Sequence, residues 1–410
     1  MTVINGIEID DIQYSRNIIR EAIENNETIE DKLHVITVIS NPCMYARRYI
    51  LMKEFIKRME MDEADVILYV VELAYGKQPF IITTAKNPRH LQIRCETPLW
   101  HKENMINVGV KRLLPPNWKA MAWIDADLSF ESSTWAKDTL RILNGTKDIV
   151  QLFSHAIDMN FDGTAMSCFT SFGHQYVKQL PYYSGAGGVR FWHPGYAWAC
   201  TKRAFDKMGG LYDLGLLGSG DNIIALSLIS NGQRGINDAS TDGYKATISD
   251  YEKKVRTLRL GYVPGVVNHY FHGSKKNRQY MSRWAILIKH NYDPLIHVTY
   301  DKNGVLVPTK SCPRELLDDI MTYFQERVED DCYKNPSVEM QRHFDDELRA
   351  AIVEPIVDNS LRAAIVEPIV DTALRSPIVE QHTLGSRIFE KGIGEPAKLP
   401  IVFPFSNILQ

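Results

Sequence analysis

The stretch AMAWIDAD, residues 120–127, places two carboxylates one residue apart directly after five apolar residues. Residues 120–124 carry no charge and predict a buried strand that ends where Asp125 begins. Two carboxylates at a strand end can face the same crevice, and their hard oxygen atoms suit Mg²⁺ or Mn²⁺. The stretch therefore predicts a metal-binding corner of a sheet. Two solvated aspartates at the start of a loop, or a helix cap, would give the same pattern.

Strands and helices alternate through the residues around this stretch. Apolar, β-branched runs predict strands, and apolar residues spaced along one face predict helices. The predicted elements cover residues 33–40, 45–60, 66–71, 91–94 and 101–113. This alternation favours an α/β fold with a single Rossmann-like, mostly parallel sheet flanked by helices.

Polar residues follow three of the predicted strands. Asn41 comes after the first strand, Glu72 ends the second, and Asp125 and Asp127 follow the strand over 120–124. Ligands of open α/β sheets bind beyond the carboxyl ends of the strands. We therefore expect these side chains to lie along one edge of one crevice.

The composition is that of a globular protein. The chain has 410 residues, of which 44% are apolar and 24% charged, and its formal net charge of −3 argues against broad attraction to nucleic acid. Six scattered cysteines without a CxxC pair indicate reduced thiols. The first residues lack a basic and apolar leader, and no apolar run reaches the roughly 18–20 residues that span a bilayer. We expect a cytoplasmic protein without a membrane span.

The stretch from His101 to Phe130 resembles the core of the GT-A nucleotide-sugar glycosyltransferases. It contains a helix with the step Asn107-Val108-Gly109, followed by a strand that ends in a DxD motif. In that family the motif binds the metal and the donor diphosphate, which implies that Asp125 and Asp127 bind Mn²⁺ or Mg²⁺ and that Asp125 also faces the donor.

The same resemblance implies further donor-binding residues. Asn41, with Arg47 or Arg48 nearby, and Glu72 would hold the nucleobase and ribose. Lys102 and Asn107 would line the donor pocket. Surface charges at the three cationic positions and a strand-end cap at Glu72 are equally good interpretations. These residues are Asn41, Arg47, Arg48, Glu72, Lys102 and Asn107.

The segment HYFHGSKKNR, residues 269–278, resembles the late part of GT-A enzymes, where a histidine is a third metal ligand and is followed by glycine and basic residues. This resemblance implies His272, although His269 is an alternative ligand. Lys275, Lys276 or Arg278 would neutralise diphosphate. A structural histidine beside a solvated basic run is the competing interpretation. A zinc half-site would need a second Cys or His pair, which the sequence does not offer.

Gly218-Ser219-Gly220-Asp221 resembles the acceptor-side segment of GT-A enzymes, where glycines precede an acidic residue at a helix start. In inverting members that acid is the catalytic base, which implies Asp221 as the group that deprotonates the acceptor. The family more often has Trp-Gly-x-Glu-Asp, whereas this chain has Asn222 beside a single acid. A helix N-cap is an equally good interpretation. The rings of Trp192, His193, Tyr196 and Trp198 would stack on a sugar or base, or pack in the core.

The resemblance is to a divergent, family-2-like subgroup found in phages, large viruses and microbes. It implies a metal-dependent transfer of a sugar from a UDP- or GDP-linked donor to an acceptor hydroxyl on a glycan or lipid sugar. A hydroxymethylated DNA base is a further candidate acceptor, with basic residues in 275–283 contacting phosphate. The alternatives are a nucleotidyltransferase and a non-catalytic nucleotide-sugar-binding protein. A Gly-rich, basic loop after the first strand, which a nucleotidyltransferase would need, is missing.

The expected organisation has four parts. An N-terminal extension (1–32) precedes a GT-A domain (33–310) with a nucleotide-sugar half (33–130) and an acceptor half (131–310), and a helical segment (311–345) and a repeat-containing tail (346–410) follow. In the tail, LRAAIVEPIVDNS recurs with a period of thirteen and then decays. So few short copies do not make a solenoid and predict an appendage, or else an oligomerisation or partner segment. A hairpin around Asn303-Gly304 and a helix over 314–328 are expected before it.

Overall fold

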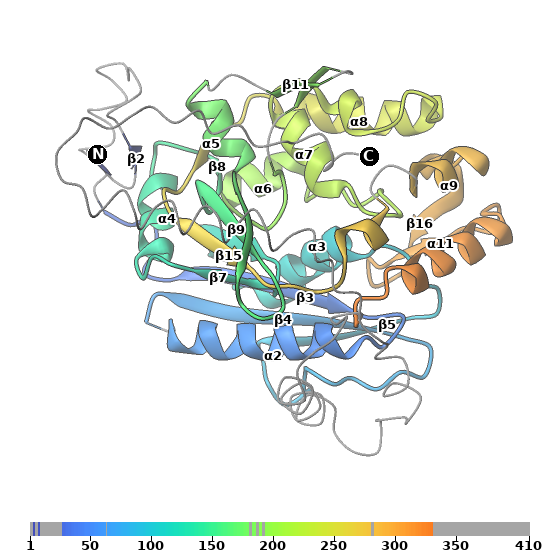
Figure 1. The fold of residues 1–410 in the computed structure, drawn as a ribbon, viewed down its shortest axis with the longest axis horizontal. Helices are drawn as coiled ribbons and strands as arrows, with labels where there is room; N and C mark the ends of the chain where they lie inside the picture. The colour runs from blue at the N-terminus through green and yellow to red at the C-terminus, as the bar shows by residue number, and fades with distance from the viewer. Residues whose placement is uncertain are drawn as a thin grey trace, which may run out of the picture.

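The computed structural model describes residues 27–62, 64–179, 193–279 and 283–330, together with four short strand segments at 3–4, 7–8, 183–185 and 188–190 (Figure 1). Most of the predicted N-terminal extension, apart from residues 3–4, 7–8 and 27–32, and the whole repeat-containing tail lie outside the described residues.

A seven-stranded sheet forms the centre of the molecule, in the order β14-β8-β13-β6-β3-β4-β5. Only β13 runs antiparallel to its neighbours in this sheet. The predicted α/β class, with a mostly parallel sheet flanked by helices, is confirmed. The strands are β3 (Leu33–Ser40), β4 (Val66–Tyr75), β5 (His90–Cys95), β6 (Ala120–Ile124), β8 (Ile149–Gln151), β13 (Ala197–Thr201) and β14 (Leu260–Tyr262).

A second sheet of four strands lies against the first and was not predicted from the sequence. Its order is β10-β9-β15-β7, and β15 runs antiparallel to β7. The register sets His269 opposite Leu128, so the chain just after the DxD motif lies beside the late histidines. The strands are β7 (Leu128–Phe130), β9 (His155–Met159), β10 (Ala165–Thr170) and β15 (Val266–His269).

Helices cover both faces of the central sheet. In Figure 1, α2 runs along one face and α3 along the other. Apolar side chains of α2 and α4 pack on the first face, and those of α3 and α6 to α8 on the second. The longer helices are α2 (Ala46–Met61), α3 (Lys102–Leu113), α4 (Trp135–Leu143), α7 (Gly220–Leu228), α8 (Asp242–Val255) and α11 (Arg314–Glu326). The shorter ones are α5 (Phe172–Val177), α6 (Lys202–Met208), α9 (Arg283–Lys289), α10 (Pro294–His297) and the 3-10 turns η1 (Gly232–Gly235) and η2 (Lys275–Arg278).

Remaining short strands form three hairpins. They are β1 (Val3–Ile4) with β2 (Ile7–Glu8), β11 (Tyr183–Gly185) with β12 (Gly188–Arg190), and β16 (Val298–Tyr300) with β17 (Leu306–Pro308). The last confirms the hairpin predicted around residues 303–304.

One predicted boundary is wrong. The second strand does not stop at Glu72 but continues to Tyr75. Residues 72–75 pair with β5, and Leu73 and Ala74 are buried, so burial and pairing carry the strand past its charged residue. Within the described part of the chain, no helix has both the length and the apolar character needed to cross a bilayer.

Candidate metal and transfer site

Three side chains converge at the carboxyl end of β6. Oδ2 of Asp127 lies 2.8 Å from Nε2 of His272 and 3.5 Å from Nε2 of His269. One candidate ligand atom from each residue lies within 4.8 Å of the others. The pairing of β15 with β7 causes this convergence, because it holds His269 beside the residue that follows Asp127. We call these three residues the Asp-His-His cluster.

A buried carboxylate orients one histidine of the cluster. Oδ1 of Asp158, on β9, lies 2.8 Å from Nδ1 of His269 and accepts a hydrogen bond from the Tyr196 hydroxyl at 3.0 Å. Asp158 is 1% exposed. Burial works to lower the pKa of His269, but Asp127 and Asp158 outweigh it and raise this pKa. With Nδ1 committed to Asp158, Nε2 is the nitrogen that faces Asp127.

The cluster has the donor set of a divalent-metal site. Oδ1 of Asp127 is buried and has no hydrogen-bond partner among the described residues, so a carboxylate oxygen is left uncompensated. Burial, with the nearby Arg278 guanidinium, lowers the pKa of His272 to about 4, so its imidazole is neutral near pH 7 and able to coordinate a cation. Two imidazole nitrogens and a carboxylate oxygen suit first-row divalent ions such as Mn²⁺ better than Mg²⁺. The residues present therefore fit a divalent cation.

Asp125 makes a different contact from the one predicted. Its Oδ1 lies 2.5 Å from Nζ of Lys102, the first residue of α3. The structure thus joins the two predicted donor-side residues to each other and leaves Asp125 outside the Asp-His-His cluster. Burial raises the pKa of Asp125, and the neighbouring Asp127 carboxylate raises it further. The Lys102 ammonium group opposes both effects. A role for Asp125 in metal or donor binding stays a prediction.

A second acidic group lies beside this ion pair. Glu103 is 5% exposed, and burial raises its pKa to about 8, with Lys102 opposing and Asp221 adding to the rise. A Cβ on Gly220 would lie 2.6 Å from the Glu103 carboxyl carbon, so a larger residue at position 220 would force the Glu103 side chain to move. Glu103, which the sequence did not single out, therefore packs directly under the start of α7.

Asp221 lies in the first turn of α7, as predicted for an acid at a helix start. Ser219 before it has a left-handed backbone, with φ of 75°, which is strained for a residue other than glycine. A Cβ on Gly195 would lie 2.6 Å from Oδ2 of Asp221, so this glycine makes room for the carboxylate. Among the described residues, Oδ1 of Asp221 accepts a single, local hydrogen bond, from the backbone N–H of Asn222 at 2.8 Å.

A stack of rings connects the Asp221 region to the cluster. The ring of His193 stacks on Tyr196 at a centroid distance of 3.9 Å, and Tyr196 stacks on His269 at 4.5 Å. Tyr196 is also in a left-handed conformation, with φ of 80°. Trp198 packs in the core against Trp123 instead of lining a site. The predicted ring at position 192 lies outside the described residues.

Three predicted donor-binding residues already serve the protein's own backbone. The Asn41 amide bonds to both the N–H and the C=O of Tyr45, and the Asn107 amide does the same with Leu211. The Glu72 carboxylate accepts from three consecutive backbone amides, those of residues 81–83. Their contacts with a donor stay predictions, since each side chain would have to exchange these bonds.

The arginines predicted near the donor are held by the segment after α11. Arg48 bonds to both carboxylate oxygens of Glu329, and Nε of Arg327 donates to the same carboxylate at 2.6 Å. Asp330 accepts from the backbone N–H of Arg47 at 2.8 Å. Glu329 is 1% exposed, so it is a buried anion between two guanidinium groups.

The basic run reaches the cluster through Arg278. Nη2 of Arg278 lies 2.7 Å from Nε2 of His272, and Oε2 of Glu329 lies 4.0 Å from Nδ1 of the same ring. Lys276 is exposed, and the Lys275 side chain lies outside the described part of the structure. Two predicted residues, His272 and Arg278, are thus brought together beside Asp127.

Searches against protein-family models and against curated protein sequences each returned no match. One solved structure with a similar fold is a mutant of Drosophila β-1,4-galactosyltransferase 7 in complex with manganese, UDP-Gal and xylobiose. The two chains are 12% identical, and the TM-score is 0.28. The match covers 57% of this chain and 65% of the galactosyltransferase chain, which is just under two thirds of that chain's length. A protein of Desulfovibrio desulfuricans assigned as a nucleotide-diphospho-sugar transferase matches at 10% identity and a TM-score of 0.28, over 73% of this chain and 99% of that one. The 4-diphosphocytidyl-2C-methyl-D-erythritol synthase of Anaerococcus prevotii matches at 10% identity and a TM-score of 0.28, over 76% and 100%. Matches of this strength assign neither a site nor an activity to this chain.

Proposed function

We propose that this chain is a divalent-metal-dependent glycosyltransferase that moves a sugar from a UDP- or GDP-linked donor to an acceptor hydroxyl. The observation that carries the proposal is the Asp-His-His cluster at the carboxyl end of β6, with its uncompensated Asp127 oxygen and its Asp158 support. Ligands of α/β sheets bind at this edge.

Asp127, His269 and His272 would hold the cation, with Mn²⁺ favoured over Mg²⁺ by the two imidazoles. A divalent cation in such a site neutralises the charge that develops on the leaving nucleoside diphosphate. Arg278, against His272, adds a guanidinium suited to the same phosphate oxygens. Lys102 supplies a further cation at the opposite side of the DxD motif.

We further propose that Asp221 is the base that removes the proton from the acceptor hydroxyl. Asp221 is partly exposed at a strained helix start, and the glycine at position 195 lets the backbone lie close to its carboxylate. Glu103 is the less suitable base, because its pKa of about 8 keeps it protonated at neutral pH. A protonated Glu103 also removes one negative charge from beside Asp221.

The proposed acceptor is a glycan hydroxyl, with a hydroxymethylated DNA base as the alternative. The formal net charge of −3 weighs against DNA. We also propose residues 33–310 as the transferase domain. Its two halves share the metal site, since Asp127 comes from the first half and both histidines from the second.

The proposal is tested by incubating the full chain with Mn²⁺ and a panel of UDP- and GDP-sugars and measuring the nucleoside diphosphate released. We expect release from one donor group, lost about 100-fold or more in Asp127→Ala. His290→Ala is the control, because His290 contacts the surface residue Asp319 and not the cluster.

Two outcomes contradict the proposal. The first is that no nucleotide sugar is hydrolysed and none raises the melting temperature in the presence of Mn²⁺. The second is that Asp127→Ala hydrolyses the donor as fast as the parent chain. Release of pyrophosphate from a nucleoside triphosphate and a sugar phosphate would indicate a nucleotidyltransferase instead.

A further inference from the structure

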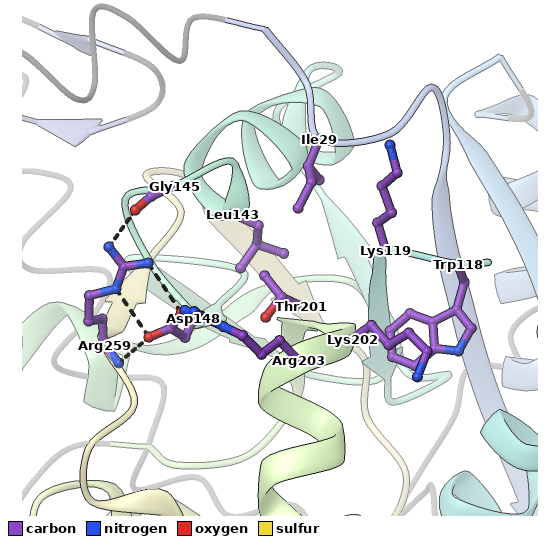
Figure 2. A pocket seen from close by; sticks show the side chains of 10 residues that line it. All are labelled: Ile29, Trp118, Lys119, Leu143, Gly145, Asp148, Thr201, Lys202, Arg203 and Arg259. Atoms are coloured by element: carbon purple, nitrogen blue, oxygen red, sulfur yellow. Dashed lines mark hydrogen bonds and ion pairs between the residues drawn. The ribbon is translucent and has the colours of Figure 1, made fainter. Parts of the chain in front are cut away.

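Figure 2 shows a cavity of about 520 Å³. It lies at the end of the central sheet opposite to the end that carries the Asp-His-His cluster. Lys119 precedes β6, Asp148 precedes β8 and Arg259 precedes β14, so the cavity opens at the amino ends of parallel strands. The cluster follows the carboxyl end of β6. The cavity, here called the basic pocket, is therefore separate from the proposed transfer site. It is lined by Ile29, Trp118, Lys119, Leu143, Gly145, Asp148, Thr201, Lys202, Arg203 and Arg259.

The charge of the basic pocket is strongly unbalanced. Four of its lining side chains are cationic, Lys119, Lys202, Arg203 and Arg259, and Asp148 is the one carboxylate among them. The arginine and Lys202 side chains remain 40 to 81% exposed, so their charges face solvent. This local excess of positive charge contrasts with the formal net charge of the whole chain, which is −3.

Asp148 orients the guanidinium groups of Arg203 and Arg259, but its single negative charge does not neutralise both of them. Its Oδ1 lies 2.9 Å from Nη2 of Arg203, and its Oδ2 lies 3.1 Å from Nε of Arg259. Arg259 also donates to the carbonyl oxygen of Gly145. Although burial opposes it, the hydrogen bonds from Arg259 and Arg203 lower the pKa of Asp148 to about 2, so it is ionised whenever a ligand binds. One carboxylate thus orients two planar cations on the same wall, as in sites that recognise phosphate.

The lysines complete the ring of positive charge. In Figure 2, Lys119 and Ile29 lie on the side of the pocket away from Arg259, and Lys202 and Arg203 extend from the start of α6. The ammonium group of Lys202 lies 5.6 Å from the centroid of the Trp118 ring and forms an ion pair with Asp206 at 2.6 Å. Lys119 is exposed, and its ammonium group forms no ion pair with any of the residues that the structure describes.

We propose that the basic pocket binds a small phosphate-bearing anion with two or three negative charges, such as pyrophosphate or the phosphate groups of a nucleotide. Four lining cations against two carboxylates, Asp148 in the pocket and Asp206 paired with Lys202, leave two positive charges in excess, which matches a dianion. The cavity lies within the range of small-molecule sites, about 300–1,000 Å³. A concave, partly apolar wall favours a small ligand over the backbone of a nucleic acid.

Isothermal titration of the full chain with pyrophosphate, in EDTA so that no divalent cation is present, tests the proposal. We expect saturable binding that weakens about tenfold or more in the double variant Lys119→Ala/Arg203→Ala. Both side chains are exposed, so the variant should fold normally. Lys207→Ala is the matched control, because Lys207 is on the same helix, α6, and its ammonium group contacts Thr257 outside the pocket.

Three results would overturn the proposal: no saturable heat, equal binding by the double variant, or binding of duplex DNA without binding of pyrophosphate. Comparison of pyrophosphate with a nucleoside triphosphate shows whether a free phosphate or a nucleotide is preferred. The test is independent of the proposed transferase activity, since Asp127→Ala should bind pyrophosphate in EDTA like the parent chain.

Discussion

Nδ1 of His269 lies 2.8 Å from Oδ1 of Asp158, at a position where both side chains are buried. This contact determines which imidazole nitrogen faces Asp127, and it also increases the basicity of the ring. The Tyr196 hydroxyl holds the same carboxylate oxygen from the other side. Asp158 therefore acts on the cluster through His269 and does not belong to the cluster itself.

Replacing Asp158 should weaken metal binding without removing a ligand. We expect Asp158→Asn to lower the affinity for Mn²⁺ about 10- to 100-fold, because an amide holds the imidazole less strongly than a carboxylate. Titration of Mn²⁺ followed by electron paramagnetic resonance measures this directly. Asp162→Asn is the control, since Asp162 is exposed in the following turn and, within the described part of the chain, hydrogen-bonds to Thr164 alone. Equal Mn²⁺ affinities of the two variants would show that Asp158 does not support metal binding by His269.

The two aspartates of the DxD motif should differ in metal binding. In the absence of a donor, Asp127→Asn should abolish measurable Mn²⁺ binding, whereas Asp125→Asn should change the affinity by less than about fivefold. The reason is that Asp127 lies against both imidazoles, while Asp125 pairs with Lys102. Calorimetric titration of both variants with Mn²⁺ separates these cases. Equal losses would mean that Asp125 leaves Lys102 to bind the metal.

Glu103 should make stability depend on pH. Its pKa rises from 4.5 to about 8 in the folded chain, chiefly through burial, so folding favours the protonated form. The contribution to the free energy of unfolding is complete below pH 4.5 and is lost as the pH rises through 8, a change of roughly a few kcal/mol. Urea unfolding at pH 5, 7 and 9 should show this loss in the parent chain and a smaller one in Glu103→Gln.

The control for that series is Glu315→Gln, an exposed change on α11 that should leave the profile of the parent chain intact. If Glu103→Gln and the parent chain lose stability in parallel between pH 5 and 9, then Glu103 is already ionised in the folded state.

Breaking the Arg48–Glu329 contact should be costly. Despite the opposing effect of burial, Arg48 and Arg327 hold the pKa of Glu329 well below its usual range. Glu329→Gln would leave the buried guanidinium group of Arg327 and the partly buried one of Arg48 without their carboxylate, and we expect the free energy of unfolding to fall by about 3–5 kcal/mol. Glu54→Gln breaks an exposed ion pair with Lys57 on the same helix that carries Arg48, and it should cost no more than about 0.5 kcal/mol. Urea denaturation of both variants tests the difference, and equal losses would contradict a buried role for Glu329.

The sequence predicted four of the seven strands of the central sheet, β3 to β6, because these are apolar runs, but it did not predict β8, β13 and β14, of which β8 and β14 have only three residues each. The wrong end of the second strand has a specific cause. A charge inside an apolar run usually ends a strand, but Glu72 is satisfied by backbone amides of residues 81–83 and remains in the sheet. The pattern of residues around Glu72 does not show that the amides of a later loop will bind its carboxylate. The small sheet was missed because its strands are short and only partly apolar.

The candidate site was predicted in outline only. The choice between His269 and His272 depends on the register of β15 with β7, and the structure brings both rings to Asp127. Asp158 had one available signal: it sits at an inward-facing position of an alternating strand, two residues after the buried Ala156. Glu103 had no such signal, because its burial is created by Gly220, far along the chain.

The pairing of β7 with β15 has a consequence for how the chain reaches its native state. Ser129 and Tyr270, which bond side chain to side chain across these strands, are 141 positions apart. An ion held by the Asp-His-His cluster would join two distant stretches of the chain in the folded state, and it would stabilise that state because the unfolded chain lacks the site. The cluster does not exist until that long loop has closed. Cation binding would therefore report completed folding, and chelation would lower the melting temperature even where no sugar is transferred.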